Sequence, residues 1–269
     1  MKNSILIAIL ILISGCSVSR REEPKYFHGM SGCFLLYHLK TQSFEKEIGD
    51  TCKERFSASS TFKVPLAVMA FDSKILSENQ ILKWDGKVRQ MPMWNRDHDA
   101  KSWMQYSVVW FSQKLTPKLG EKKLKNYLNI MNYGNKDIST GITTAWLNKP
   151  NDLRGALAIS AYEQVEFMKN LWGNKFPVSI KAMELTKKII YKETSPNGFR
   201  LSGKTGSNSY DPDGKIQLGW FVAHLTNGAE EYIAVTNLRD SKPSEINSFG
   251  GPRAEKLMKK ILTDVGLWQ

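Results

Sequence analysis

Two groups of residues in this chain have the types and spacing needed for acyl transfer: Ser60 with Lys63, three positions on, and the tripeptide Lys204-Thr205-Gly206 far downstream. A serine hydroxyl is a weak nucleophile until a base removes its proton. Residues three apart on a helix share a face, so the Lys63 amine can reach the Ser60 hydroxyl if a helix begins there. Alone, Ser-x-x-Lys also fits a helix cap followed by a solvated lysine. With the tripeptide in the correct order, the pair indicates a serine that an amide substrate acylates.

Three shorter motifs lie between these groups: Ser107-Val108-Val109, Tyr133-Gly134-Asn135 and Trp146-Leu147. Ser107 has a hydroxyl that can relay a proton, although a lone serine in an apolar run ordinarily bonds to the backbone. Trp146 can only donate a hydrogen bond, through its indole N–H, and its alternative role is plain core packing. We interpret Tyr133-Gly134-Asn135 as a structural turn at the wall of a cleft.

Val108 and Val109 stand where a comparable serine motif, Ser-Asp-Asn, has a polar pair. Two apolar side chains predict a dry pocket around the lysine. Burial disfavours an ammonium ion, so the pKa of Lys63 is expected to fall below its ordinary value of about 10.4. A neutral amine can add carbon dioxide.

The fold that positions these residues is expected to be α/β, of the α+β type, in a single catalytic domain spanning 17–269. Strand-like segments occur at 32–40, 199–203, 217–225 and 231–238, with a hairpin turn at 226–230. Apolar residues recur at helical spacing in 63–74, 122–131, 160–172 and 178–191, and in a closing helix after Gly251-Pro252. The sheet lobe would comprise about 25–59 and 195–269, and the helical lobe about 60–194. A cleft between lobes is a usual place for a ligand.

The order and spacing of the five motifs resemble those of the class D serine β-lactamases, the oxacillinases, over nearly all of the mature chain. Further stretches that resemble the branch with a Ser-Val-Val second motif are Gly32–Tyr37, Trp103–Trp110 and Gly219-Trp220-Phe221. The resemblance implies the β-lactamase/transpeptidase-like fold, a central antiparallel sheet flanked by helices with a mostly helical lobe. It also implies hydrolysis of penicillins of the oxacillin type and others, and resistance to them.

The resemblance assigns a role to each site residue. Ser60 would form the acyl-enzyme, and Lys63 would be carboxylated on its amine (N6-carboxylysine) by carbon dioxide or bicarbonate and act as general base. Ser107 would relay protons, and Trp146 would hold the carboxylated lysine. The backbone N–H groups of Ser60 and Ser207 would bind the oxyanion. The residues expected to contact substrate are Val109, Lys204, Thr205, Gly206, Ser207 and Arg253. No metal or organic cofactor is implied.

Three other functions fit the same motifs. A penicillin sensor acylates without releasing product, but such sensors carry a multi-span membrane segment before the domain, where this chain has one short apolar run. A penicillin-binding transpeptidase or carboxypeptidase usually has further domains or an amphipathic anchor, whereas this chain ends in a helix near Gln269. An inactive binding protein is disfavoured because each expected catalytic side chain is present.

The first residues, 1–16, are interpreted as a signal peptide. Lys2 is followed by an apolar run from Ile5 to Ile13, which is too short to cross a bilayer as a helix, since about twenty residues are needed. Cys16 stands where a lipoprotein signal keeps its lipidated cysteine, and ordinary cleavage a few residues on is the alternative. The expected location is the periplasm of a Gram-negative bacterium, with or without a lipid tether to the membrane. In that oxidising compartment Cys33 and Cys52 form either a disulfide or two buried thiols.

The net charge and the histidine content limit which ligands the protein is expected to bind. The net charge is +12, but the basic residues are scattered and do not form the run that a nucleic-acid groove needs. A β-lactam is therefore the expected partner, and a nucleic acid is not. The four histidines lack the spacing of metal ligands, so no metal site is expected. The sequence leaves open whether the protein is a monomer or a homodimer.

Overall fold

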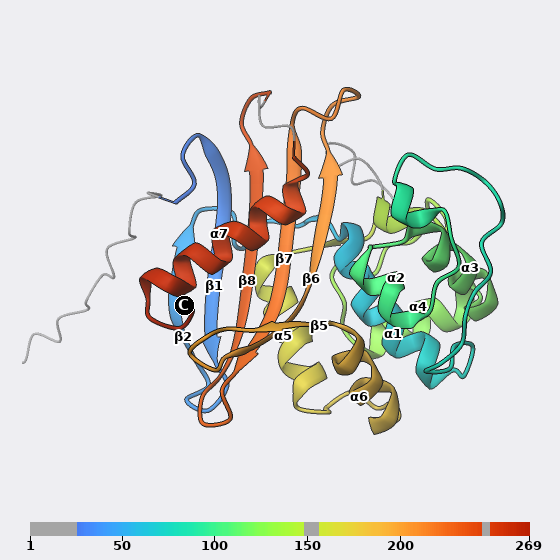
Figure 1. Ribbon diagram of the computed structural model, residues 1–269, viewed down its shortest axis with the longest axis horizontal. Coiled ribbons are helices and arrows are strands. Elements are labelled where there is room, and N and C mark those ends of the chain that lie inside the picture. The colour runs from blue at the N-terminus through green and yellow to red at the C-terminus, as the bar shows by residue number, and fades with distance from the viewer. Residues whose placement is uncertain (1–25, 148–155, 244–247) are drawn as a thin grey trace, which may run out of the picture.

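The computed structural model describes residues 26–147, 156–243 and 248–269 of the 269-residue chain. Its centre is a six-stranded antiparallel sheet with the strand order β2-β1-β8-β7-β6-β5 (Figure 1). The strands are β1 (Met30–His38), β2 (Ser43–Gly49), β5 (Tyr191–Thr194), β6 (Arg200–Ser209), β7 (Gln217–Thr226) and β8 (Glu231–Asp240). Both ends of the described chain thus contribute to one sheet, and the expected fold class is confirmed.

The central strands β7 and β8 are buried along almost their whole length, because helices cover both faces of the sheet. Side chains alternate between the faces. Phe221 packs in the cluster that includes helix α7 (Gly250–Asp264), whereas Trp220 packs in the larger cluster on the other face. Helix α7 crosses the front of the sheet in Figure 1. Helix α5 (Ala161–Trp172) packs on β8, β1 and β7 from behind.

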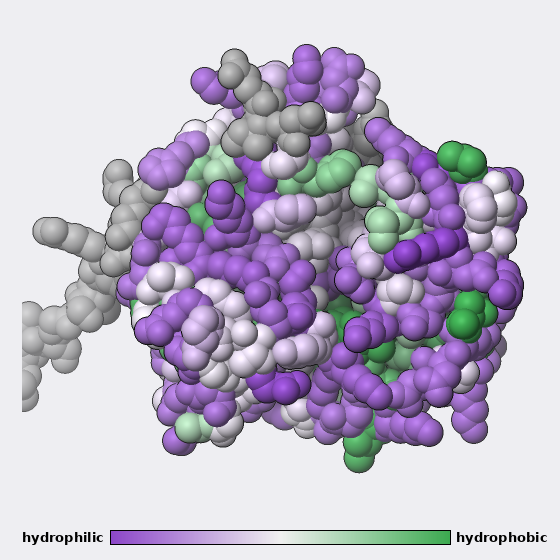
Figure 2. Space-filling view, viewed as in Figure 1, coloured by the Kyte–Doolittle hydropathy of each residue, from purple (hydrophilic) through white to green (hydrophobic). Residues whose placement is uncertain are grey.

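The remaining helices form a lobe beside β6 (Figure 1). They are α1 (Lys63–Asp72), α2 (Ala100–Gln105), α3 (Val109–Leu119), α4 (Glu121–Ile130) and α6 (Ile180–Ile189). Helix α1 is buried from its first residue almost to its last, as expected of a helix with apolar residues on all sides. It packs against α3 and α6, so it is the core of this lobe. Polar residues cover most of the face of the molecule seen in Figure 2.

A disulfide joins Cys33 in β1 to Cys52, with the Cα atoms 5.0 Å apart. Both cysteines are buried. A short two-stranded sheet follows Cys52, made by β3 (Phe56–Ser57) and β4 (Ala158–Ile159). The disulfide therefore fastens the segment that leads to Ser60 onto the main sheet.

Some elements differ from the sequence expectations. Strand β6 extends beyond the expected 199–203, so it contains the whole Lys204-Thr205-Gly206 motif. Strands β2 and β5 were not expected, because they are short, mostly exposed and rich in charged residues, which is typical of sheet edges. Helix α5 packs on the sheet and β5 pairs with β6, so both elements contribute to the sheet side.

The proposed signal segment, with Cys16, lies outside the described residues. Within the described ranges, no helix is both long and apolar enough to cross a membrane. The same ranges contain no cluster of three or more His, Cys, Asp or Glu side chains placed to hold a metal ion.

Candidate active site

Ser60 lies in a 3₁₀ turn, η1 (Ser59–Phe62), that runs directly into α1 at Lys63. This arrangement places the two side chains on one side of the chain, and Lys63 Nζ donates to Ser60 Oγ at 2.9 Å. Ser60 is partly exposed, whereas the Lys63 side chain is 0% exposed. The hydroxyl therefore faces the solvent side of the contact and the amine faces the core.

Burial lowers the pKa of Lys63 from 10.5 to about 7. The physical cause is desolvation, which disfavours the charged ammonium form. At neutral pH, a large fraction of the Lys63 amines therefore carries a free lone pair. Such an amine can accept the proton of Ser60 or react with an electrophile.

Trp146 lies in a second 3₁₀ turn, η3 (Ala145–Leu147), and is completely buried. Its ring packs on Phe62, the neighbour of Lys63, with the ring centroids 5.0 Å apart. Its indole Nε1 is buried and has no hydrogen-bond partner among the described residues. An unpaired buried donor costs about 1–3 kcal/mol. A carboxyl group on Lys63 would be an acceptor of the kind that this indole N–H lacks.

The Lys204-Thr205-Gly206 motif lies on β6, next to η1, the turn that contains Ser60 and is called the nucleophile turn below. A Cβ atom on Gly206 would come within 3.1 Å of Thr61 Cγ2 and 3.3 Å of Ser59 Cβ. A side chain at this position would therefore force η1 or the strand to shift by a few tenths of an ångström. The glycine thus sets the spacing between the strand and Ser60.

Lys204 is the second buried lysine of the site. Its Nζ donates to the carbonyl oxygen of Thr205 at 2.9 Å. Burial and the nearby positive charge of Lys63 both hold the pKa of Lys204 well below its usual range. The charge of Lys63 therefore disfavours the protonated form of Lys204, and an anionic group nearby would favour that form again.

The end of the motif contacts the start of α7. Ser207 Oγ accepts a hydrogen bond from the backbone N–H of Gly251 at 2.9 Å. Arg253, two residues further in the first turn of α7, already pairs with a carboxylate: it donates to both oxygens of Asp240, at 2.8 Å and 2.6 Å. The expected contact between Arg253 and a substrate carboxylate stays a prediction, as does oxyanion binding by Ser207.

Ser107 occupies the sharp turn between α2 and α3. Its φ angle is +56°, in the left-handed region, and its side chain is partly exposed. Val108 is fully buried, while Val109 is partly exposed and begins α3, which packs on α1. The turn therefore directs Val108 into the core of the helical lobe, where α3 packs on α1. The proton relay by Ser107 stays a prediction.

A layer of polar side chains behind the nucleophile turn was not expected from the sequence. Gln164 of α5 donates to Thr61 Oγ1 at 2.8 Å, and Thr61 Oγ1 donates to the carbonyl oxygen of Ala58. On the side of Trp146, Ser57 Oγ donates to the carbonyl oxygen of Trp146 at 3.1 Å, and Asn208 Nδ2 lies 3.5 Å from Ser57 Oγ. Nothing in the spacing of these residues indicates that they meet, although Thr61 lies inside the Ser-x-x-Lys motif.

Known proteins resemble this chain over almost its full length. Residues 34–263 match the penicillin-binding protein transpeptidase domain family. β-Lactamase OXA-1 of Escherichia coli is 35% identical, over 99% of this chain and 100% of that protein. The structure of the class D β-lactamase BAT-2 superposes with a TM-score of 0.79 at 32% identity, over 91% of this chain and 95% of the other. The chain belongs to the class D β-lactamase family.

A receptor domain also resembles this class D family member. The C-terminal domain of the Bacillus licheniformis BlaR penicillin receptor superposes with a TM-score of 0.81 at 30% identity, over 91% of this chain and 94% of the other. The Staphylococcus aureus mecR1 protein is 31% identical over 90% of this chain, which spans 39% of that protein. The fold is thus common to lactamases and receptors, so it does not by itself distinguish turnover from acylation alone.

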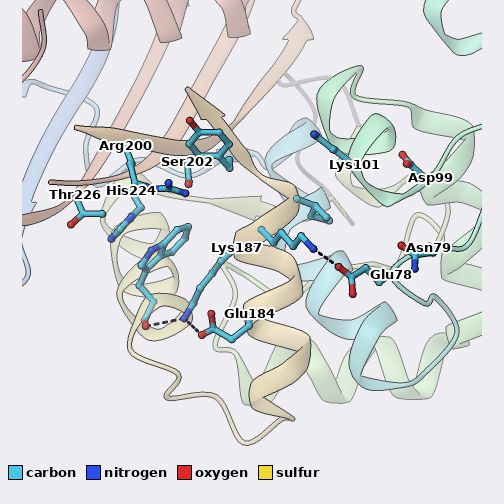
Figure 3. A pocket seen from close by; sticks show the side chains of 14 residues that line it. Glu78, Asn79, Asp99, Lys101, Glu184, Lys187, Arg200, Ser202, His224 and Thr226 are labelled. Carbon is cyan, nitrogen blue, oxygen red and sulfur yellow. Dashed lines mark hydrogen bonds and ion pairs between the residues drawn. The ribbon is translucent and has the colours of Figure 1, made fainter. Parts of the chain in front are cut away.

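Two surface hollows of this class D family member lie near the sheet edge. The larger, about 640 Å³, is shown in Figure 3 and is not lined by any of the predicted catalytic residues. Its charged side chains are partly paired with each other: Lys187 donates to Glu184 at 2.6 Å, and Lys188 contacts Glu78 at 2.5 Å. The larger hollow is therefore separate from the residues predicted to carry out the chemistry.

The smaller hollow, about 550 Å³, adjoins the Lys-Thr-Gly strand. Its walls come from α2, β5 and β6, and they include Gln105, Lys192, Lys204 and Thr205. Lys192 is paired with Glu255 at 3.0 Å. A molecule in this hollow would contact Lys204 and Thr205.

Proposed function

We propose that this protein is a serine β-lactamase that opens the β-lactam amide of penicillins through an acyl-enzyme on Ser60. The observation that carries the proposal is the 2.9 Å contact between Ser60 Oγ and a fully buried Lys63 amine, whose pKa is lowered to about 7. A serine with a neutral, positioned amine beside it is an activated nucleophile. Membership of the class D family supports the choice of substrate.

We further propose that Lys63 is carboxylated. Its neutral nitrogen would attack carbon dioxide, forming an N–C bond and releasing one proton to solvent. The carboxyl group would supply the general base for acylation and for deacylation. Support comes from the low pKa of Lys63 and from the unpaired indole N–H of Trp146. Trp146 would donate to the group and keep it ionised, because hydrogen bonds to the charged form favour it.

In acylation, Ser60 would lose its proton and attack the lactam carbonyl carbon. The N–H groups of Ser60 and Ser207 would bind the developing oxyanion. The carbon–nitrogen bond of the ring would then break, and Ser107 would deliver a proton to the departing nitrogen. In deacylation, an activated water would attack the ester carbon and release Ser60 together with the product acid.

Lys204 and Thr205 would bind the substrate carboxylate, because Lys204 lies beside the hollow next to β6 and Thr205 is partly exposed there. Val108 and Val109 would exclude stray water from the lysine. The sequence Ser107-Val108-Val109 supports assignment to the branch with a Ser-Val-Val second motif. Arg253 has a lesser claim to this role, since Asp240 already occupies its guanidinium.

Hydrolysis of nitrocefin or oxacillin by the purified protein tests the proposal. Many turnovers per molecule are expected, together with a penicilloyl adduct on Ser60 detected by intact-protein mass spectrometry. Ser60→Ala should lose both, whereas Ser73→Ala, which removes a hydroxyl bonded to the Met69 carbonyl, should lose neither. A single stoichiometric burst without turnover would instead support the penicillin-receptor function suggested by the BlaR likeness.

We also propose export to the periplasm of a Gram-negative bacterium, with Cys16 lipidated. The support is the apolar run from Ile5 to Ile13, which ends at Ser14-Gly15-Cys16. Fractionation of cells should find the wild-type protein with membranes and find Cys16→Ala either released or unprocessed. A wild-type protein that is recovered soluble, beginning beyond Cys16, would contradict the lipid anchor.

A further inference from the structure

We propose that Ser57 and Asn208 are positioning residues that hold the Trp146 turn against carboxylated Lys63. The inference rests on the proposed function, since it concerns the base of that reaction. Neither residue belongs to a motif that suggested chemistry in the sequence. Both are placed at Trp146 by the fold, one from β3 and the other from the end of β6.

Ser57 holds the backbone of Trp146 directly. Its Oγ donates to the carbonyl oxygen of Trp146 at 3.1 Å, and the Ser57 side chain is fully buried. The carbonyl oxygen of Ser57 in turn accepts from Trp220 Nε1 at 3.1 Å and from Ser59 Oγ at 3.3 Å. Ser57 is therefore fixed to the main sheet and to the nucleophile turn at the same time as it holds Trp146.

Asn208 adds a contact from β6, directly after Ser207. Its Nδ2 lies 3.4 Å from the carbonyl oxygen of Leu147 and 3.5 Å from Ser57 Oγ. Its Oδ1 accepts from the backbone N–H of Ser209 at 2.8 Å, which fixes the orientation of the amide. These contacts are longer than those of Ser57, so Asn208 should contribute less.

The Trp146 turn, η3, is only three residues long, so each hydrogen bond that holds its backbone affects where the indole N–H points. The backbone of η3 is also held by three other bonds: Ala145 N–H donates to Gly141 at 2.9 Å, Leu147 N–H donates to Thr144 at 2.7 Å and Leu157 N–H donates to Ala145 at 3.0 Å. None of these three bonds uses the carbonyl of Trp146. Removing the Ser57 hydroxyl leaves that buried carbonyl without this donor, and the turn would shift to regain one. A hydrogen bond weakens steeply with misalignment, so the indole N–H would bind the carboxyl group less well.

The test compares Ser57→Ala with Ser112→Ala. Ser112 is a matched control: it is also a fully buried serine hydrogen-bonded to a tryptophan, Trp103, whose Nε1 donates to Ser112 Oγ at 3.0 Å. For each protein, activity is removed by stripping carbon dioxide and restored by titrating bicarbonate. Acylation and deacylation rates are measured separately by rapid mixing with a penicillin. Thermal melting reports the loss of stability.

We expect Ser57→Ala to raise the bicarbonate concentration for half-reactivation about tenfold, the effect of losing about one hydrogen bond to a buried group. Deacylation should slow more than acylation. Asn208→Ala should show the same pattern at roughly threefold, and it serves as the test if Ser57→Ala does not fold. Ser112→Ala should melt at a lower temperature with an unchanged bicarbonate requirement.

Two results would overturn the inference: an unchanged bicarbonate requirement in both Ser57→Ala and Asn208→Ala, or an equal shift in Ser112→Ala. Failure of the proposed function is a distinct outcome. A wild-type protein that does not hydrolyse penicillins, or that hydrolyses them at full rate without carbon dioxide, would overturn the carboxylated base and the inference with it.

Discussion

The guanidinium of Arg253 and the carboxylate of Asp240 form a two-point ion pair that links the first turn of α7 to the end of β8. Asp240 is buried, and its Oδ2 also accepts from the backbone N–H of Gln217 at 3.0 Å. The pair therefore joins a helix and two strands at one point. A planar guanidinium suits two parallel bonds to a carboxylate, which is the geometry seen here.

The first prediction concerns this pair. Arg253→Ala should lower the free energy of unfolding by about 3 kcal/mol, because Asp240 is left as an uncompensated buried charge. The KM for penicillins should change less than about threefold, because substrate would have to compete with Asp240 for the arginine. Urea denaturation and steady-state kinetics measure the two effects. A large rise in KM with little loss of stability would instead establish Arg253 as a substrate ligand.

Carboxylation of Lys63 should depend on pH with a midpoint near the lowered pKa of about 7. Below the midpoint the amine is protonated and cannot attack carbon dioxide, and above it the amine is free. The rate of reactivation by carbon dioxide, at a fixed dissolved concentration, should rise through pH 7 and then level off. An inflection near the ordinary lysine value of about 10.4 would contradict the prediction.

The lowered pKa of Lys63 also predicts how the stability of the uncarboxylated protein varies with pH. The unfolded chain keeps the Lys63 proton up to about pH 10.4, whereas the folded chain releases it near pH 7. Because the unfolded state binds more protons in this window, the contribution of Lys63 to the free energy of unfolding should rise with pH. Denaturation of the wild type and Lys63→Met in carbon-dioxide-free buffer isolates this contribution, which should be absent in the variant.

Trp146→Phe should slow deacylation at least about tenfold while acylation changes about threefold or less. Phenylalanine keeps an apolar ring against Phe62 but removes the indole N–H, so the base for the attacking water is no longer held. The variant should accumulate acyl-enzyme, visible by mass spectrometry during turnover. Trp103→Phe is the control, because its indole bonds to Ser112 within the helical lobe. Equal slowing of both steps in Trp146→Phe would show that the tryptophan serves packing alone.

Removing the disulfide in Cys33→Ala/Cys52→Ala should lower the free energy of unfolding by about 3 kcal/mol, since the bridge closes a loop between residues 19 apart in the chain. Activity at low temperature should persist, because among the described residues no hydrogen bond joins either cysteine to Ser60 or Lys63. Wild type treated with a reductant should show the same loss of stability. No change in the urea midpoint would mean that the loop is held by packing rather than by the bridge.

The parts of the site that sequence predicts well are those set by local geometry. The contact between Ser60 and Lys63 follows from residues three apart at a helix start, and burial of Lys63 follows from the apolar run behind it. Strand β6 was predicted too short, because Gly206 disfavours a strand by intrinsic propensity, while pairing with β7 extends the strand to Ser209.

The parts that sequence does not predict depend on contacts between distant segments. Asp240 is an ordinary acidic residue in the sequence, and only the packing of α7 against β8 brings Arg253 to it. Ser57 and Asn208 are 151 positions apart, and no local pattern relates them. Polar residues of this kind are identified by their burial and their partners rather than by their spacing.

Gly206 limits which substitutions the strand beside Ser60 can accept. Even a methyl group there would lie 3.1 Å from Thr61 and 3.2 Å from Trp220, tighter than most carbon contacts. A side chain at this position would require Thr61, Ser59 or Trp220 to shift by a few tenths of an ångström. Variants selected for bulkier antibiotics should therefore carry their changes in α2, across the hollow from β6, where Gln105 lines the same hollow as Lys204 and Thr205.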